Sequence, residues 1–157
     1  MSKQPIEIFM PPNMLKAKVG GTIAGLDMAA IGRAEAALEN LKTEFSEWIE
    51  TDAARLAEYR NAYAVKKNAD TRGNLYRAAH DLKGQALTFE YPLVARVASS
   101  LCKLLDAPDR NVPLTLIDAH VDAIRVIVRD KMKATGDKMA LVLAKELEAR
   151  VDEFLAR

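Results

Sequence analysis

The spacing of the apolar residues limits most strongly what this chain can fold into. From residue 27 onward they recur every three or four positions, and no stretch shows sustained two-residue alternation. A period of three to four places side chains on one face of an α-helix, whereas a half-buried strand needs a period of two. The chain is therefore predicted to be all-α.

Five helical segments are expected. The first begins at Asp27 as N-cap, and its pattern allows either a break at Thr51-Asp52 or one helix to about residue 66. The second is capped by Asp70 or Thr71 and ends at "EYP". Further helices begin at Pro92, near residue 116 and near residue 137. Joined by short loops, these segments indicate a helical bundle of four or five helices.

The N-terminal residues 1–26 have a different composition. They hold three of the six prolines and three of the seven glycines, which predicts an irregular segment. Residues 27–157 are expected to form a single domain.

Charge and cysteine content exclude several classes of protein. The 23 basic and 22 acidic residues nearly cancel, so no nucleic-acid partner is expected. No apolar run reaches the length of a membrane span, and the start does not resemble a signal peptide, which favours a cytoplasmic protein. The single cysteine, Cys102, excludes an internal disulfide and is expected to be a packed small residue. No acidic cluster indicates a metal site, and no cofactor is expected.

His80 is the main candidate for chemistry. If the apolar residues of its helix define the buried face, successive rotations of about 100° place His80 roughly 140° from the centre of that face, toward solvent. Tyr76, Lys83, Gly84 and Leu87 share its side of the helix. The other histidine, His120, has no comparable surroundings and is expected to be structural or incidental.

Gly84 lies one turn after His80, where glycine costs about 1 kcal/mol relative to alanine. The simplest compensation is room for another protein to approach the imidazole. A solvated imidazole is partly neutral at neutral pH and is then a nucleophile. Lys83 can pair with phosphate oxygens as a point charge, and Gln85 can donate a hydrogen bond at the rim. A surface histidine with no function and a glycine that serves packing remain the alternative interpretation.

The stretch "AHDLKGQALTFEYPLVARVASSLCKLLD" resembles the signature of histidine-containing phosphotransfer (HPt) domains. That signature reads approximately His-x-Leu-Lys-Gly-x-(small), then an aromatic or glycine turn and a second apolar helix. The matching residues here are His80, Leu82, Lys83, Gly84, Ala86, Phe89, Tyr91, Pro92, Val94, Val97 and Leu101.

The resemblance implies an antiparallel four-helix bundle, with an extra helix here. It implies that His80 accepts a phosphoryl group from a receiver-domain aspartate and passes it to another receiver. Lys83 then supplies charge, Gly84 steric access and Gln85 a polar contact near the imidazole. The partners would be receiver domains of hybrid histidine kinases and of response regulators, which supply an acidic pocket and magnesium.

The chain has no GxxxxGK loop and no glycine-rich ATP-lid pattern, so we expect a phosphoryl carrier rather than a kinase or another enzyme. The docking surface is predicted to include Tyr76, Leu87, Arg96 and Ser99, on the His80 face and on the helix that begins at Pro92. A monomer is favoured, although the sequence does not decide the oligomeric state.

Three other functions stay open on sequence grounds. The chain could be a dimerising phosphoacceptor fragment of a histidine kinase, marked by two long helices that pair. It could be a helical adaptor without chemistry, in which His80 is replaceable. It could also be a helical enzyme with His80 as general base, but no second catalytic group stands at a convincing spacing.

Overall fold

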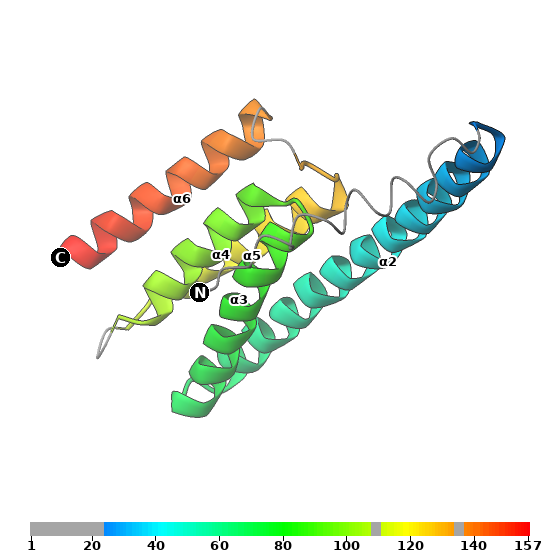
Figure 1. The fold of residues 1–157 in the computed structure, drawn as a ribbon. Coiled ribbons are helices and arrows are strands. Elements are labelled where there is room, and N and C mark those ends of the chain that lie inside the picture. Colours follow the sequence, from blue (N-terminus) through cyan, green and yellow to red (C-terminus); the bar gives the residue numbers. More distant parts are fainter. Residues whose placement is uncertain (1–23, 108–110, 134–136) are drawn as a thin grey trace, which may run out of the picture. The chain divides into compact units, whose positions relative to one another are not determined.

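The structure, a computed structural model, describes residues 24–107, 111–133 and 137–157. All regular structure in these ranges is α-helical, as the apolar spacing predicts. The helices are α2 (Ala24–Val65), α3 (Ala69–Thr88), α4 (Pro92–Leu105), α5 (Leu114–Arg129) and α6 (Lys138–Ala156) (Figure 1). Most of the predicted irregular segment, residues 1–23, lies outside the described residues, whereas residues 24–26 belong to α2.

Helix α2 is one continuous helix, so the break considered at Thr51-Asp52 does not occur. The hydroxyl of Thr51 donates a hydrogen bond to the carbonyl of Glu47 at 2.9 Å, which accommodates its polar side chain within the helix. The helix begins at Ala24, and Asp27 lies in its first turn rather than at its N-cap.

The chain divides into two compact units, and α2 contributes to both. In the first unit, which ends at Thr43, every side chain over 27–43 is exposed, including the apolar Ile31 and Leu41. In the second unit α2 buries apolar residues such as Leu56. The apolar period therefore identifies the helix correctly along its whole length, but it marks a buried face only in the second unit.

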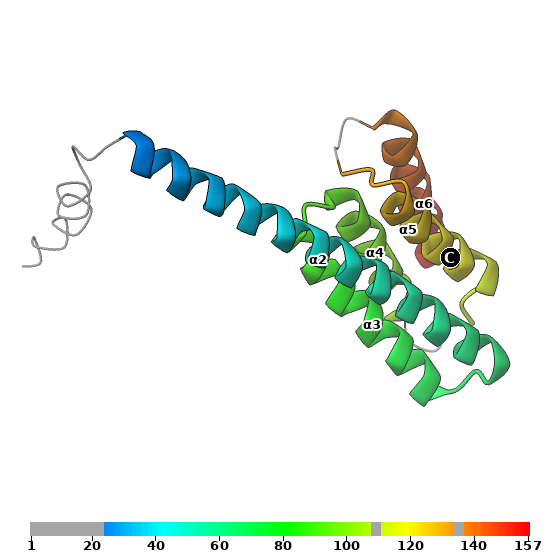
Figure 2. The same cartoon turned by 90° about the vertical axis from the view of Figure 1, so that its right-hand side faces the viewer.

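The second unit, Glu44–Arg157, is a helical bundle. Helix α4 packs against α3, α5 and α6, and α6 also packs on α5. An ion pair of 2.6 Å between Arg60 and Asp118 joins α2 to α5. Successive helices run in opposite directions (Figures 1 and 2). The predicted antiparallel four-helix bundle is confirmed as α2 to α5, with α6 as the extra helix.

Helix α4 is buried on nearly all sides because it has neighbours on three of them. Its buried residues are Leu93, Val94, Ala95, Val97, Ala98, Ser100, Leu101, Cys102, Leu104 and Leu105. Small residues such as Ala98 allow the close approach of helix axes, while the leucines fill the space between them. Helix α4 is therefore the rigid support against which α3 is positioned.

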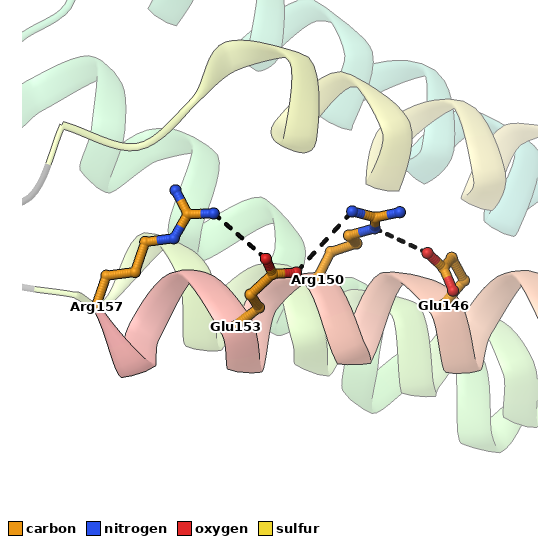
Figure 3. A network of polar contacts seen from close by, with 4 residues as sticks. All are labelled: Glu146, Arg150, Glu153 and Arg157. Carbon is orange, nitrogen blue, oxygen red and sulfur yellow. Dashed lines mark hydrogen bonds and ion pairs between the residues drawn. The ribbon is translucent and has the colours of Figure 1, made fainter.

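The outer face of α6 is charged. Glu146, Arg150, Glu153 and Arg157 form a chain of ion pairs with separations of 2.8, 3.9 and 3.3 Å (Figure 3). Exposed pairs at this spacing each contribute only a few tenths of a kcal/mol, about 0.3–0.5. They identify this face as solvated.

None of the described helices is both long and apolar enough to cross a membrane.

The N-terminus of α3 is fixed by a capping box. The side-chain oxygen of Asn68 accepts a hydrogen bond from the Thr71 backbone N–H at 2.9 Å, and the Thr71 hydroxyl accepts one from the Asn68 N–H at 3.2 Å. The N-cap is therefore Asn68, and the prediction of Asp70 or Thr71 was wrong. The guanidinium of Arg72 also donates to the carbonyls of Leu105 and Ala107, which ties this end to the end of α4.

The C-terminus of α3 is a Schellman turn. The Tyr91 N–H donates to the Ala86 carbonyl at 2.7 Å, and the Glu90 N–H donates to the Leu87 carbonyl at 3.3 Å. Glu90 occupies the left-handed position of this turn with φ of 66°. The chain then enters α4 at Pro92, which stands at the predicted first helical position.

His120 is a residue of α5 and is fully buried on the side that faces α4, so its predicted structural role is confirmed. Its Nδ1 lies 2.7 Å from the Leu116 carbonyl, which can only accept, so Nδ1 carries the proton. The Nε2 atom of the neutral ring then accepts from the Ser100 hydroxyl at 2.9 Å. Burial lowers the pKa of His120 and outweighs the opposing effect of the Leu116 carbonyl.

We expect His120 to make the fold sensitive to acid. Its ordinary pKa is 6.5 and its folded pKa is lower, so unfolding takes up a proton at low pH. Its stabilising contribution is fully present above about pH 6.5 and is lost as the pH falls, by up to about 1.4 kcal/mol per pH unit. The free energy of unfolding, measured with urea, should therefore fall more steeply with decreasing pH in the wild type than in His120→Gln. Equal slopes would contradict this account.

We expect Glu90→Gly to stabilise the chain. A left-handed backbone strains any residue with a Cβ, and glycine removes that strain, so the free energy of unfolding should rise by about 0.5–1 kcal/mol. Thr88→Gly is the matched control, because it places glycine inside the last turn of the same helix, where it should destabilise. Urea unfolding of both variants tests this, and a less stable Glu90→Gly variant would be the contrary result.

Candidate functional site

His80 stands on the exposed side of α3. The opposite side of this helix is buried through Leu75, Ala79, Leu82 and Ala86. These are the residues from which the sequence predicted the core face, and the predicted outward direction of His80 is confirmed. Since the core residues fix the rotation of α3, they also fix the direction in which the imidazole points.

The ring of Tyr76 lies against the imidazole. The ring centroids of Tyr76 and His80 are 6.1 Å apart, with the planes inclined by 25°. The two residues are one helical turn apart, and Tyr76 is half-buried against the core. Tyr76 therefore limits the orientations of the imidazole, besides being exposed enough for the partner contact predicted from the sequence.

Gly84 opens the space beside His80. A Cβ built at position 84 would meet no atom within 4 Å, and the residue is exposed. Packing within the described chain therefore does not require glycine here, which removes the structural explanation that the sequence left open. The helix has a smooth, uncovered surface one turn beyond the imidazole.

Lys83 lies on the α4 side of α3. Its side chain is half-buried, and its charge acts on the buried thiol of Cys102 in α4. Burial raises the pKa of Cys102 to about 11, and the Lys83 charge opposes that rise without cancelling it. Among the described residues Lys83 forms no ion pair. Its ammonium is thus available to an anion placed on this face. Cys102 is buried, as expected for a packed small residue.

Gln85 and Leu87 lie on different sides of His80. Gln85 is exposed and lines a shallow groove on the α2 side of α3, together with Asp52 and Arg55. Leu87 is 64 % exposed and follows His80 by two helical turns on the same face, about 10 Å along the axis. The structure thus places Leu87 in line with the imidazole and Gln85 at the edge of the site.

Arg96 and Ser99 are on the side of α4 that faces α6. Arg96 forms a two-point ion pair with Glu148 of α6, with one Nε–Oε2 separation of 3.0 Å. Ser99 is exposed and lines a groove between α4 and α6 beside Arg96 and Lys103. No described contact brings either residue to His80, so their part in a docking surface stays a prediction.

Sequence reasoning missed an aromatic cluster at the end of α3. Phe45 lies 5.0 Å from Phe89 and 5.5 Å from Trp48, and Trp48 lies 6.4 Å from Phe89, between ring centroids. Trp48 falls in the apolar period of α2, which favours burial, yet it is 53 % exposed. The only signal in the sequence was the large aromatic side chain itself, which does not reveal exposure.

The described residues contain no group of histidine, cysteine and carboxylate side chains that could hold a metal ion. Around His80 the chain offers an exposed nucleophile, a cation and open space. That arrangement suits transfer of a small anionic group to or from another macromolecule.

A family model described as Hpt domain matches residues 31–154. This span covers most of the 157-residue chain and includes the whole His80 region. Searches of curated proteins and of solved structures returned no significant match. Hpt domains are phosphocarrier modules and not ATP-binding catalytic domains. The chain belongs to the Hpt domain family, whose members carry out phosphotransfer in two-component relays.

Proposed function

We propose that His80 is the phosphoacceptor of this chain, taking a phosphoryl group from a receiver-domain aspartate and passing it to another receiver. The observation that carries this proposal is the exposed imidazole at the middle of α3 with open space over Gly84. A receiver must bring its aspartyl phosphate to bonding distance of a ring nitrogen. Only an uncovered helix face permits a globular partner to approach so closely.

The chemical step needs little from the protein beyond position and charge. The lone pair of the unprotonated ring nitrogen forms the N–P bond while the P–O bond to the aspartate breaks, and the electron pair returns to the carboxylate. The other ring nitrogen keeps its proton. The reverse step, with a second receiver aspartate as nucleophile, regenerates the imidazole. Either direction of flow uses the same geometry.

Lys83 is assigned to charge support in this scheme. The transferred group carries negative charge, and an ammonium one turn away stabilises it on the imidazole. Gln85 serves as a polar contact at the edge of the docked partner. The receiver supplies the acidic pocket and magnesium, so this chain works without a cofactor of its own. We further propose that it acts in the cytoplasm as a monomer and passes phosphate between hybrid kinases and response regulators.

The test of this proposal is transfer from receiver domains that carry a labelled aspartyl phosphate. The wild type should take up an acid-labile label, and His80→Gln should take up none. His120→Gln, which removes the only other histidine of the chain, should still be labelled. A broad receiver panel that labels neither the wild type nor His120→Gln would instead favour a helical adaptor in which His80 has no chemical role.

We expect Gly84→Ala to change stability and transfer in opposite directions. Because the added Cβ meets no atom of the chain, the free energy of unfolding should rise by about 1 kcal/mol. A docked receiver would meet that methyl group, and a clash of about 1–3 kcal/mol would slow transfer roughly five-fold to more than a hundred-fold. Urea unfolding and transfer rates on one preparation measure both effects. A stabilised variant with unchanged transfer would show that the partner does not approach over Gly84.

A further inference from the structure

Exposed large apolar side chains in the second unit fall in separate places. Leu87 and Trp48 lie at the C-terminal end of α3 and beside it, Met139 and Val142 lie on α6, and Val65 is the last residue of α2. Isolated exposed apolar residues are common, but those that adjoin a functional face indicate an interaction surface. Leu87 is on the His80 face of α3, and Trp48 borders a groove together with Gln85 of the same helix, whereas the pair on α6 borders neither.

The indole of Trp48 has a fixed support. It packs on Phe45, which stacks on Phe89 at the end of α3 with planes inclined by 26°. One side of Trp48 therefore contacts this aromatic platform. The rest of the side chain is open to solvent, so that 53 % of the surface of the residue is exposed. A large aromatic side chain held in place in this way loses little entropy on binding, and tryptophan is enriched among the residues that dominate interface energies.

Two adjoining grooves run along the boundary of α2 and α3, starting at Trp48. One groove, of about 230 Å³, is lined by Trp48, Phe89 and Gln85 together with Asp52 and Arg55. A second groove shares Asp52, Arg55 and Gln85 and extends to Arg77 and Asp81. Asp81 follows His80 directly in the sequence. The two grooves thus share a wall between α2 and α3, and together they extend from Trp48 to Asp81, the residue next to His80 in the sequence.

The distances fit the footprint of one partner. At a rise of about 1.5 Å per residue, Gln85 lies about 7 Å and Phe89 about 13 Å along α3 from His80. A standard interface covers about 800 Å² on each partner, which corresponds to a disc of radius about 16 Å. A receiver centred on His80 therefore covers Leu87 on the same face, and along the axis its footprint extends as far as the end of α3, where Phe89 supports Phe45 and Trp48. On the opposite side, Arg96 is occupied by its ion pair with Glu148.

We propose that Trp48, carried on the Phe45–Phe89 platform, is the main anchor for the receiver domain, so that the docking surface extends from His80 toward α2. This inference rests on the proposed function, because the occupant is the receiver that exchanges phosphate with His80. The complementary receiver presents an apolar rim to Trp48 and Leu87 beside its acidic phosphate pocket. The acidic pocket faces Lys83, which has no ion pair within the described part of the chain.

Trp48 is the only tryptophan of the chain, so its fluorescence reports on the proposed contact directly. Addition of a tryptophan-free receiver should shift the emission to shorter wavelength and protect the indole from acrylamide quenching. Binding that is seen by calorimetry but leaves the emission and the quenching unchanged would overturn the inference.

Substitutions give an independent readout. Trp48→Ala should weaken receiver binding by about thirty-fold or more, the threshold of an interface hot spot, and slow transfer accordingly. Trp48→Phe should recover part of the affinity, and Met139→Ala, at a more exposed apolar position on α6, should bind as the wild type does. Unchanged binding and transfer in Trp48→Ala would refute the anchor.

Phosphoramidate, a small phosphodonor that needs no docking surface, separates this inference from the proposed function. It should label His80 equally in the wild type, Trp48→Ala and Met139→Ala, because their imidazoles are identical. If the wild type takes label from phosphoramidate but from no receiver, the relay function fails and the anchor fails with it. If the wild type exchanges phosphate with receivers as fast as Trp48→Ala does, only the anchor fails.

Discussion

Burial of one face of α3 against α4 determines everything else about the site. Leu75, Ala79, Leu82 and Ala86 have no more than 1 % of their surface exposed, and they fix the rotation of α3. That rotation directs His80 outward and places Lys83 along the α4 boundary. Turning the helix by a single residue, about 100°, in one of the two directions would carry the imidazole beside the core. The apolar packing and the placement of the nucleophile are thus one constraint.

The two ends of α3 hold this register along the helix axis. The Asn68–Thr71 capping box begins the helix, and the Schellman turn at Glu90 ends it. Arg72 joins the first turn of α3 to the carbonyls that end α4, so the two helices are connected at one end by hydrogen bonds and at the other by a short loop. Strain at Glu90 is tolerated because the surrounding hydrogen bonds and the burial of Tyr91 leave the turn no alternative.

Much of this arrangement could be predicted from the sequence, because the period of the apolar residues depends on local geometry alone. The direction of His80, the start of α4 at Pro92 and the burial of Cys102 all follow from spacing and composition. Features that depend on which helices become neighbours could not be predicted. Arg96 pairs with Glu148 of another helix, and Trp48 lies beside Phe89 at the end of another helix. Each of these contacts joins residues more than forty positions apart in the sequence. Periodicity also cannot tell that the same apolar stripe is covered in the second half of α2 and exposed in the first.

The central claim is that His80, and no other residue, carries the phosphoryl group. The most direct measurement follows the imidazole signals of both histidines by nuclear magnetic resonance during exchange with a phosphorylated receiver. The account predicts that the His80 ring resonances shift and gain coupling to phosphorus, while those of His120, enclosed between Ser100 and Leu116, stay in place. Phosphorus appearing on another residue, or no change at His80 while label enters the chain, would contradict it.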